Sequence, residues 1–241
     1  MTSPFSSVID PLGSAIADFW HGAKRAQVKV FSDQADPDVM PINYLFRSEE
    51  EMPEREQEAL SLCRGKVLDV GAGAGSHALV LQQKGLSVTA LEISEKACDV
   101  MKARGVENVM CGDFYTLDPK PFDTLLLLMN GIGLAGTLDR LPQFLQTCKN
   151  WLAPGGQVLL ESSDILYLYE EEDGSVLVNL NGSYYGELTY VMQYKKEQTE
   201  PFPWLFVDVG VLQQYAEEAG FEVELIREEE DSHYLARLSL K

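Results

Sequence analysis

Basic residues are scarce in this sequence. Its 241 residues include 19 Lys and Arg against 38 Asp and Glu, so the formal net charge is −19 at pH 7. Binding to nucleic acid depends on Lys and Arg side chains that displace phosphate counterions, and the few basic residues here are not clustered. Anionic membrane surfaces are disfavoured for the same reason. We therefore expect neither a nucleic acid nor a membrane as a partner of this chain.

Cysteine and histidine are scarce too. The four cysteines form no Cys-x-x-Cys pair and the three histidines are far apart, so the sequence predicts neither a metal site nor a disulfide framework. The longest fully apolar run, residues 125–129, is much shorter than the roughly 18–20 residues of a membrane span. The first ten residues lack the basic and apolar regions of a secretory signal. We expect a cytoplasmic protein with reduced thiols.

What the sequence does contain is an ordered alternation of strand and helix patterns. Apolar runs predict the strands, and residues such as Ser94 and Gly105 are suitable caps for a helix between two of them. This β-α-β-α order predicts an α/β fold with a doubly wound, mostly parallel sheet. We expect strands at residues 66–70, 87–92, 109–110, 122–129 and 157–161, and helices between them at 76–84, 94–104 and 138–152.

The pattern differs on either side of this alternation. Upstream it favours helices within 14–31 and over 49–63. Downstream, Asn181-Gly182 separates two segments rich in β-branched and aromatic residues, 175–180 and 184–194, which predicts a hairpin. We expect residues 1–241 to form a single domain with four parts. These are an N-terminal lid or cap at 1–48, a cofactor-binding core at 60–163, a β-hairpin insertion at 164–207, and a C-terminal helix and strand pair at 208–241.

The most informative segment is a glycine-rich turn after the first core strand. The apolar residues 67–70 are followed by Gly71, Gly73 and Gly75, and a helix pattern begins at Ser76. Glycine lets the backbone approach a ligand closely. The free N–H groups and positive dipole end of the following helix favour anionic groups. We interpret this turn as the binding site of a nucleotide-like ligand.

A carboxylate follows the turn at the spacing expected for ribose recognition. Glu92 ends the next strand, 21 positions after Gly71, and an acidic residue about 20 positions after the first glycine commonly binds ribose hydroxyls. The dinucleotide fingerprint Gly-x-Gly-x-x-Gly/Ala would place a small residue at position 76. The sequence has Ser76 there, which argues against an NAD(P)-dependent oxidoreductase but keeps it as an alternative.

The pattern Val-Leu-Asp-Val-Gly-x-Gly-x-Gly resembles motif I of the class I S-adenosylmethionine-dependent methyltransferases. Further segments resemble this family in the same order: the strand end at Glu92, Gly112-Asp113, the strand at 122–130, and the Leu-x-Pro-Gly-Gly turn at 152–156. The resemblance covers about residues 60–161 and the closing strand pair. It implies a Rossmann-like methyltransferase fold with seven strands, an antiparallel C-terminal strand, S-adenosylmethionine as the cofactor, and methyl transfer as the activity.

The resemblance also implies roles for matching residues around the first two strands. The backbone of Gly71, Gly73 and Gly75 would contact the methionine part of the cofactor. Asp69 would either support this loop or reach the cofactor's ammonium group through water. Glu92 would hold both ribose hydroxyls.

Further expected cofactor contacts come from other segments. Asp113 would accept a hydrogen bond from the adenine amino group, while Phe114 or Ile93 packs on the ring. Asn130 would lie beside the transferable methyl group. Two more contacts would come from the lid. Arg47 would pair with the cofactor carboxylate, and Tyr44 would close over the sulfonium through cation–π attraction.

The sequence favours a small-molecule substrate. Asn130-Gly131-Ile132-Gly133 departs from the Asn/Asp-Pro-Pro-Tyr sequence of family members that methylate nucleobase amines or glutamine amides. The negative charge favours a neutral or cationic compound, and a basic protein tail stays open. The insertion would shape the substrate pocket or, with equal weight, extend the core or form a homodimer interface.

No catalytic residue is evident. His21, Asp164, Tyr184 and Tyr185 are candidate bases by expected position only, and Glu161 lies with Asp164 near the expected substrate mouth. A non-catalytic S-adenosylmethionine-binding protein is therefore a second alternative to an active methyltransferase.

Overall fold

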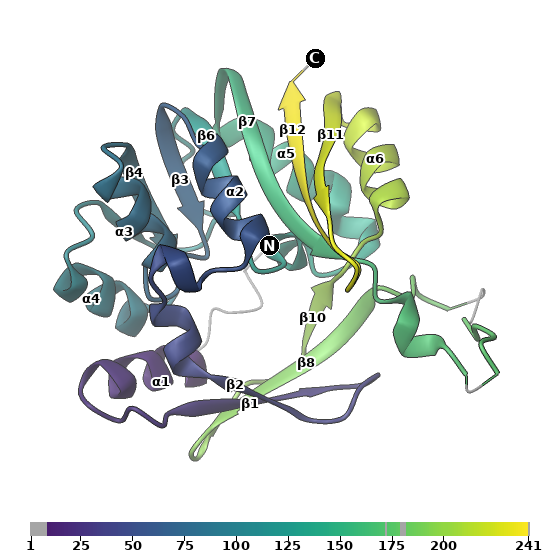
Figure 1. Ribbon diagram of the computed structural model, residues 1–241, viewed down its shortest axis with the longest axis horizontal. Helices are drawn as coiled ribbons and strands as arrows, with labels where there is room; N and C mark the ends of the chain where they lie inside the picture. The colour runs from purple at the N-terminus through teal and green to yellow at the C-terminus, as the bar shows by residue number, and fades with distance from the viewer. Residues whose placement is uncertain (1–8, 172, 179–181, 241) are drawn as a thin grey trace.

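The computed structural model describes residues 9–171, 173–178 and 182–240. At its centre is a seven-stranded sheet in the order β11-β12-β7-β6-β3-β4-β5 (Figure 1). Five neighbouring strands are parallel, and β12 runs antiparallel to both β7 and β11. The strands are β3 (Lys66–Val70), β4 (Ser87–Glu92), β5 (Val109–Cys111), β6 (Phe122–Leu127), β7 (Leu152–Ser163), β11 (Phe221–Glu228) and β12 (His233–Leu240). The predicted doubly wound sheet is confirmed.

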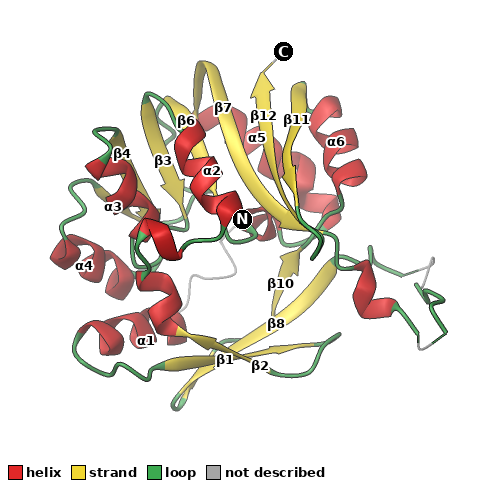
Figure 2. Cartoon of the chain, in the orientation of Figure 1, coloured by secondary structure: helices red, strands yellow, loops and turns green. Residues whose placement is uncertain are grey.

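Helices cover both faces of this sheet (Figure 2). On one face, α2 (Glu54–Leu62), α3 (Ser76–Gln83) and α4 (Glu95–Arg104) bury side chains such as Leu60, Leu81 and Met101 against the strands. On the other, α5 (Leu141–Trp151) and α6 (Val209–Glu218) bury side chains such as Phe144 and Leu212. Burial on both faces explains why the inner strands are continuously apolar.

A second, antiparallel sheet joins two segments that are far apart in the sequence. Its order is β10-β8-β1-β2, with β9 paired to β8, and α1 (Pro11–Trp20) packs against both β8 and α4. The expected lid supplies two of its strands and the expected insertion supplies three. They are β1 (Gln27–Ser32), β2 (Asp38–Pro41), β8 (Glu187–Tyr194), β9 (Glu197–Gln198) and β10 (Phe202–Leu205).

The small sheet faces the edge of the large sheet where ligands bind in open α/β folds. In Figure 1 the β3 arrow points toward the small sheet and the β12 arrow points away from it. The residues that follow β3, β4 and β6 are therefore on the side that the small sheet covers.

Two sequence-based expectations were wrong in detail. The helical pattern over 14–31 overlaps helix α1, which begins earlier, at Pro11, but it ends in strand β1, because residues 27–32 pair with β2 and β8. The described part of 175–180 is not a strand and forms only an isolated bridge at Val176. The insertion does contain a hairpin, between β8 and β9, with its turn at Lys195. Of the predicted Asn181-Gly182 turn, Asn181 lies outside the described residues.

Short 3-10 helices connect the main elements. The helix predicted from residue 49 begins instead at Glu54, after Pro53. No helix among the described residues is long and apolar enough to cross a membrane. The 3-10 helices are η1 (Ile42–Phe46), η2 (Glu49–Glu51), η3 (Gly131–Ala135), η4 (Leu138–Arg140) and η5 (Leu166–Tyr169).

The core of α5 gives a direct test of this packing. Phe144 is fully buried between α5 and the sheet, whereas its neighbour Gln143 is exposed. We expect Phe144→Ala to lower the free energy of unfolding by about 3–5 kcal/mol, because it removes apolar contacts and leaves a cavity. Urea denaturation measures the change. Gln143→Ala is the matched control and should stay within about 0.5 kcal/mol of wild type; equal losses for both would contradict the assigned packing.

Candidate functional site

The glycine turn between β3 and α3 is shaped by left-handed backbone. Gly71 and Gly73 have φ angles of 74° and 56°, which glycine adopts at no steric cost. A Cβ atom added at either position would meet no atom within 4 Å, so the turn presents bare backbone to open space. The N–H groups of Gly71 and Ala72 donate to the Leu91 carbonyl at 2.9 and 3.1 Å, which fixes the turn on β4.

Gly75 is needed for a different reason. Its φ is 84°, and a Cβ there would lie 2.9 Å from side-chain carbons of Met101 and Val106. The glycine lets α3 begin close against α4 and the segment after it. The sequence pattern assigned all three glycines to ligand contact; at Gly75 the structure shows a packing requirement.

The Glu92 carboxylate is held by backbone donors at the end of β4. Its Oε2 accepts from the Gly73 N–H at 2.9 Å, and its Oε1 accepts from Ile93 and Ser94 at 2.8 and 2.9 Å. Burial raises the pKa of Glu92, while these three N–H groups oppose that shift. The carboxylate thus links the glycine turn to the start of α4 and has a fixed orientation.

The lid segment contributes an arginine that is buried beside the turn. Arg47 follows η1 and is 8% exposed. Its Nη2 donates to both carboxylate oxygens of Glu56, at 3.0 and 2.8 Å, and its guanidinium carbon lies 3.5 Å from the centre of the Tyr44 ring. The Ser76 hydroxyl donates to the Leu45 carbonyl at 2.8 Å, so the lid segment is fixed to the start of α3.

One cavity brings the lid and the turn together. It is lined by the glycine turn with Tyr44, Arg47, Asp69 and Met129. Two polar groups of this lining are buried and incompletely paired within the described chain: Nε and Nη1 of Arg47 donate no hydrogen bond, and Oδ2 of Asp69 accepts none. Unpaired buried donors and acceptors are costly. Their presence in one cavity indicates a ligand that carries both an anionic and a cationic group.

His77 completes the polar network under this cavity. Its Nε2 lies 2.7 Å from Oε2 of Glu56. Burial opposes the charged form of His77, but the hydrogen bond to Glu56 and the charges of Asp69, Glu56 and Glu161 outweigh it, so the pKa of His77 lies above its usual value of 6.5. Burial likewise opposes ionisation of Glu56, but His77 and Arg47 hold the pKa of Glu56 below its usual value. Glu56 thus lies between Arg47 and His77 in one buried polar network.

The two apolar residues expected at the adenine ring have different environments. Phe114 is 5% exposed and stacks on Trp151 with ring centres 5.8 Å apart, so its ring belongs to the core. Ile93 is partly exposed next to Glu92 and is the better placed of the two. Asp113 is also partly exposed, in the turn after β5, where it accepts from the Tyr115 N–H at 2.9 Å.

The loop after β6 has unusual backbone geometry. Met129 and Asn130 both have positive φ, 55° and 59°, in a region that non-glycine residues rarely adopt. Oε2 of Glu161 accepts from the Met129 N–H at 2.7 Å, and Nδ2 of Asn130 donates to the Leu205 carbonyl of β10 at 3.1 Å. Tertiary contacts on both sides therefore maintain this conformation.

The candidate bases named from the sequence have structural partners. Tyr184 donates to Asp208 at 2.7 Å, and Tyr185 donates to Asp164 and Asp208 at 2.9 and 3.2 Å. Burial is the largest of the effects that raise the pKa of both tyrosines. Both tyrosines are therefore poor bases. His21 is an exposed residue at the C-terminal end of α1.

Sequence reasoning missed Glu56 and gave His77 and Glu161 no defined role. Glu56 lies on α2, whose overall pattern is that of a charged surface helix, yet its side chain is fully buried. The one signal available was a charged residue on the same helix face as the apolar Ala59 and Leu60.

Within the described residues, no group of three His, Cys, Asp or Glu side chains is arranged to hold a metal ion.

Comparison with known proteins agrees with this geometry. A methyltransferase domain model matches residues 67–156. A solved structure of an S-adenosylmethionine-dependent methyltransferase from Bacteroides fragilis, in complex with S-adenosyl-L-homocysteine, is 43% identical, with a TM-score of 0.90 over 100% of this chain and 97% of that chain. This chain belongs to the S-adenosylmethionine-dependent methyltransferases. The sequence matches no curated protein.

More distant methyltransferase structures share the fold alone. An amino pentose methyltransferase from Micromonospora echinaspora is 18% identical, with a TM-score of 0.51 over 78% of this chain and 88% of that one. A sugar N-methyltransferase from a Streptoalloteichus species is 15% identical, with a TM-score of 0.52 over 82% and 88%. The family membership establishes the activity class, an S-adenosylmethionine-dependent methyltransferase, and S-adenosylmethionine as the cofactor.

The raised pKa of His77 gives a prediction for stability. A histidine whose pKa is higher in the folded state stabilises that state fully below its unfolded pKa, about 6.5, and loses this contribution as the pH rises through the folded value. We expect the free energy of unfolding of wild type to fall as the pH rises above 6.5, and to fall less steeply in His77→Gln. Urea denaturation across this pH range measures both slopes. His21→Gln, at an exposed position, should retain the wild-type slope; a wild-type slope in His77→Gln would contradict the assignment.

Proposed function

We propose that this methyltransferase transfers the methyl group of S-adenosylmethionine to a small-molecule acceptor, with the cofactor bound across the ends of β3, β4 and β5. The observation that carries the proposal is the cavity beside the glycine turn, in which buried donors of Arg47 and a buried acceptor of Asp69 are unpaired within the described chain.

These two groups match the amino-acid end of the cofactor. The carboxylate would accept a hydrogen bond from Nε or Nη1 of Arg47, and Asp69 would accept one from the ammonium group, directly or through water. Charge-assisted hydrogen bonds of this type are about twice as strong as neutral ones. The open faces of Gly71 and Gly73 leave room for the backbone to contact the methionine chain between the two groups.

The nucleoside end would lie along the next two strands. Three backbone donors already occupy the Glu92 carboxylate, and of its oxygens only Oε2 has a single described donor. A ribose hydroxyl would therefore donate to Oε2. Ile93 and Asp113 are partly exposed and would receive the adenine ring and its amino group. Phe114, whose ring is in the core, would then support this site from below rather than stack on the adenine ring. Gly75 would still lie beside the methionine part and Asn130 beside the transferable methyl group.

The cofactor supplies an electrophilic methyl group, and the protein positions a nucleophile against it. Positioning alone contributes roughly 7–11 kcal/mol in well-oriented reactions. The small antiparallel sheet lies opposite the ends of the parallel strands (Figure 1) and would enclose the substrate there. The net charge of −19 favours a neutral or cationic compound, and the sugar methyltransferases among the distant structures support a small acceptor.

Isothermal titration with S-adenosylmethionine tests cofactor binding. A screen for transfer of radiolabelled methyl groups to low-molecular-weight metabolite pools then tests catalysis. Binding with transfer supports the proposal, whereas binding without transfer to any pool favours a non-catalytic binding protein. Preferential binding of NADH would support an oxidoreductase instead.

Arg47 provides a prediction that separates the two ends of the cofactor. We expect Arg47→Lys to weaken S-adenosylhomocysteine binding about tenfold or more, because lysine keeps the charge but lacks the planar fork of donors. Binding of 5′-methylthioadenosine, which lacks the amino-acid end, should not change. Titration calorimetry with both ligands measures the difference. Arg64→Lys, at an exposed arginine, is the control; a parallel loss for both ligands would contradict the role of Arg47.

A further inference from the structure

Glu161, near the end of β7, is a buried carboxylate with one unused oxygen. The side chain is 2% exposed. Oε2 accepts from the Met129 N–H at 2.7 Å, but Oε1 accepts no hydrogen bond from the described residues. Nε of Arg55 lies 3.7 Å from Oε1, which is an ion-pair distance but too long for a hydrogen bond, and this Nε donates to no described acceptor. Nη1 of Arg55 is bound to Glu229.

Asn130 presents a second unused acceptor on the same loop. Its Nδ2 is committed to the Leu205 carbonyl, which fixes the amide orientation. Its Oδ1 is buried and accepts no hydrogen bond within the described chain. The two left-handed residues Met129 and Asn130 cost conformational free energy, and such strain is typical of functional loops.

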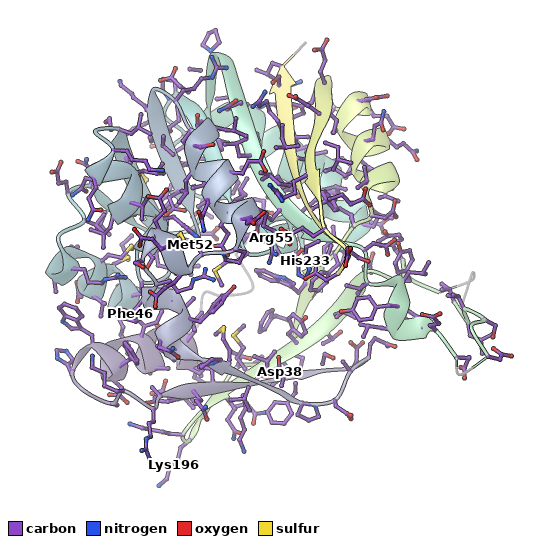
Figure 3. The ribbon with its side chains drawn as sticks, viewed as in Figure 1. Asp38, Phe46, Met52, Arg55, Lys196 and His233 are labelled. Carbon is purple, nitrogen blue, oxygen red and sulfur yellow. The ribbon has the colours of Figure 1, made fainter. Side chains whose placement is uncertain are left out.

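Both acceptors come from the ends of strands next to the proposed cofactor site. The proposed cofactor contacts follow β3, β4 and β5, whereas Asn130 and Glu161 come from β6 and β7, the next strands in the sheet. Leu127 is in register with Leu160, so the Met129–Asn130 loop and Glu161 share the same edge. Figure 3 shows Arg55, which flanks Glu161, and His233 on the side of the large sheet that faces the small one.

Two buried oxygens that accept no hydrogen bond from the described residues favour a ligand that donates, even though Oε1 of Glu161 has the charge of Arg55 beside it. We propose that Oε1 of Glu161 and Oδ1 of Asn130 bind the substrate nitrogen, that the substrate is an amine, and that Glu161 accepts a proton from its ammonium form. A hydroxyl has one proton to donate and could satisfy one of the two oxygens, whereas an ammonium has three. The positive charge also offsets a buried carboxylate. This inference rests on the proposed function.

The proton and electron balance of the step is complete. The substrate ammonium gives one proton to Glu161 and becomes a neutral amine. The nitrogen lone pair forms the new C–N bond while the C–S bond breaks and its electron pair stays on sulfur. The product is a methylated ammonium that carries the positive charge lost from the sulfonium, and Glu161 releases its proton to solvent after product leaves.

The surroundings of Glu161 suit a proton acceptor at neutral pH. Burial, together with the charge of Glu56, raises the pKa of Glu161 to about 7, against the opposing effects of Arg55, the Met129 N–H and His77. These groups come from α2, α3 and the β6 loop, and on β12 the neighbour is the apolar Leu235. Proton acceptors are most effective when their pKa lies near the working pH.

Sinefungin tests the site without knowledge of the substrate. This analogue carries a primary ammonium where S-adenosylmethionine has its methylsulfonium, whereas S-adenosylhomocysteine carries an uncharged sulfur. At pH 8 we expect wild type to bind sinefungin about tenfold or more tightly than S-adenosylhomocysteine, measured by titration calorimetry. In Glu161→Gln the amide oxygen still accepts from Met129, but an NH2 donor replaces Oε1. The preference should disappear while S-adenosylhomocysteine affinity stays within about threefold.

Three comparisons make the result decisive. Asn130→Gly, which keeps the positive φ and removes Oδ1, should also reduce the preference for sinefungin. Glu229→Gln, the matched control on the other side of Arg55, should retain it. Between pH 6 and 8 the preference should increase in wild type and stay flat in Glu161→Gln. Equal affinities in wild type, or an unchanged preference in Glu161→Gln, would overturn the inference. Failure of wild type to bind S-adenosylhomocysteine would instead refute the proposed function itself.

Discussion

The ion pair between Arg47 and Glu56 is the interaction on which the cavity depends. It joins the lid segment to α2, and through His77 it reaches α3. Removing one partner of a buried ion pair typically costs about 3–5 kcal/mol, because the other charge is left uncompensated. Since Glu56 uses only Nη2 of Arg47, Nε and Nη1 keep no hydrogen-bond acceptor within the described chain, while the ion pair holds the side chain in place. Rigid, unpaired donors bind a ligand with little loss of conformational entropy.

The sequence was sufficient to predict the large sheet and the glycine turn, because both are local patterns. A continuous apolar run is typical of a strand that is buried on both faces. Glycines at alternate positions are typical of a turn with left-handed backbone. The positive φ angles of Gly71 and Gly73 are consistent with the glycine-rich turn expected there. The packing requirement at Gly75 could not be predicted in this way, because its neighbours Met101 and Val106 are distant in the sequence.

The small sheet and the polar network could not be predicted, because both depend on contacts between distant segments. Residues 27–31 fit the end of a helix as well as a strand, and pairing with β8 decides between them. Glu56 resembles a surface residue until Arg47 and His77 surround it. Whether the oxygen atoms of Glu161 and Asn130 accept hydrogen bonds also depends on tertiary contacts. No sequence pattern indicates which acceptors will lack a hydrogen bond.

The pairing of β1 with β8 has a consequence for folding. Lys29 pairs with Gln193, so this contact closes a loop that contains most of the chain. Contacts of such high sequence separation form slowly, because the entropy of loop closure is lost before the contact is gained. During synthesis, β1 has no strand β8 to pair with until the large sheet's parallel strands have been made. The N-terminal segment is thus expected to dock late, after the Rossmann-like core has folded, and to be the first part to detach under mild denaturing conditions.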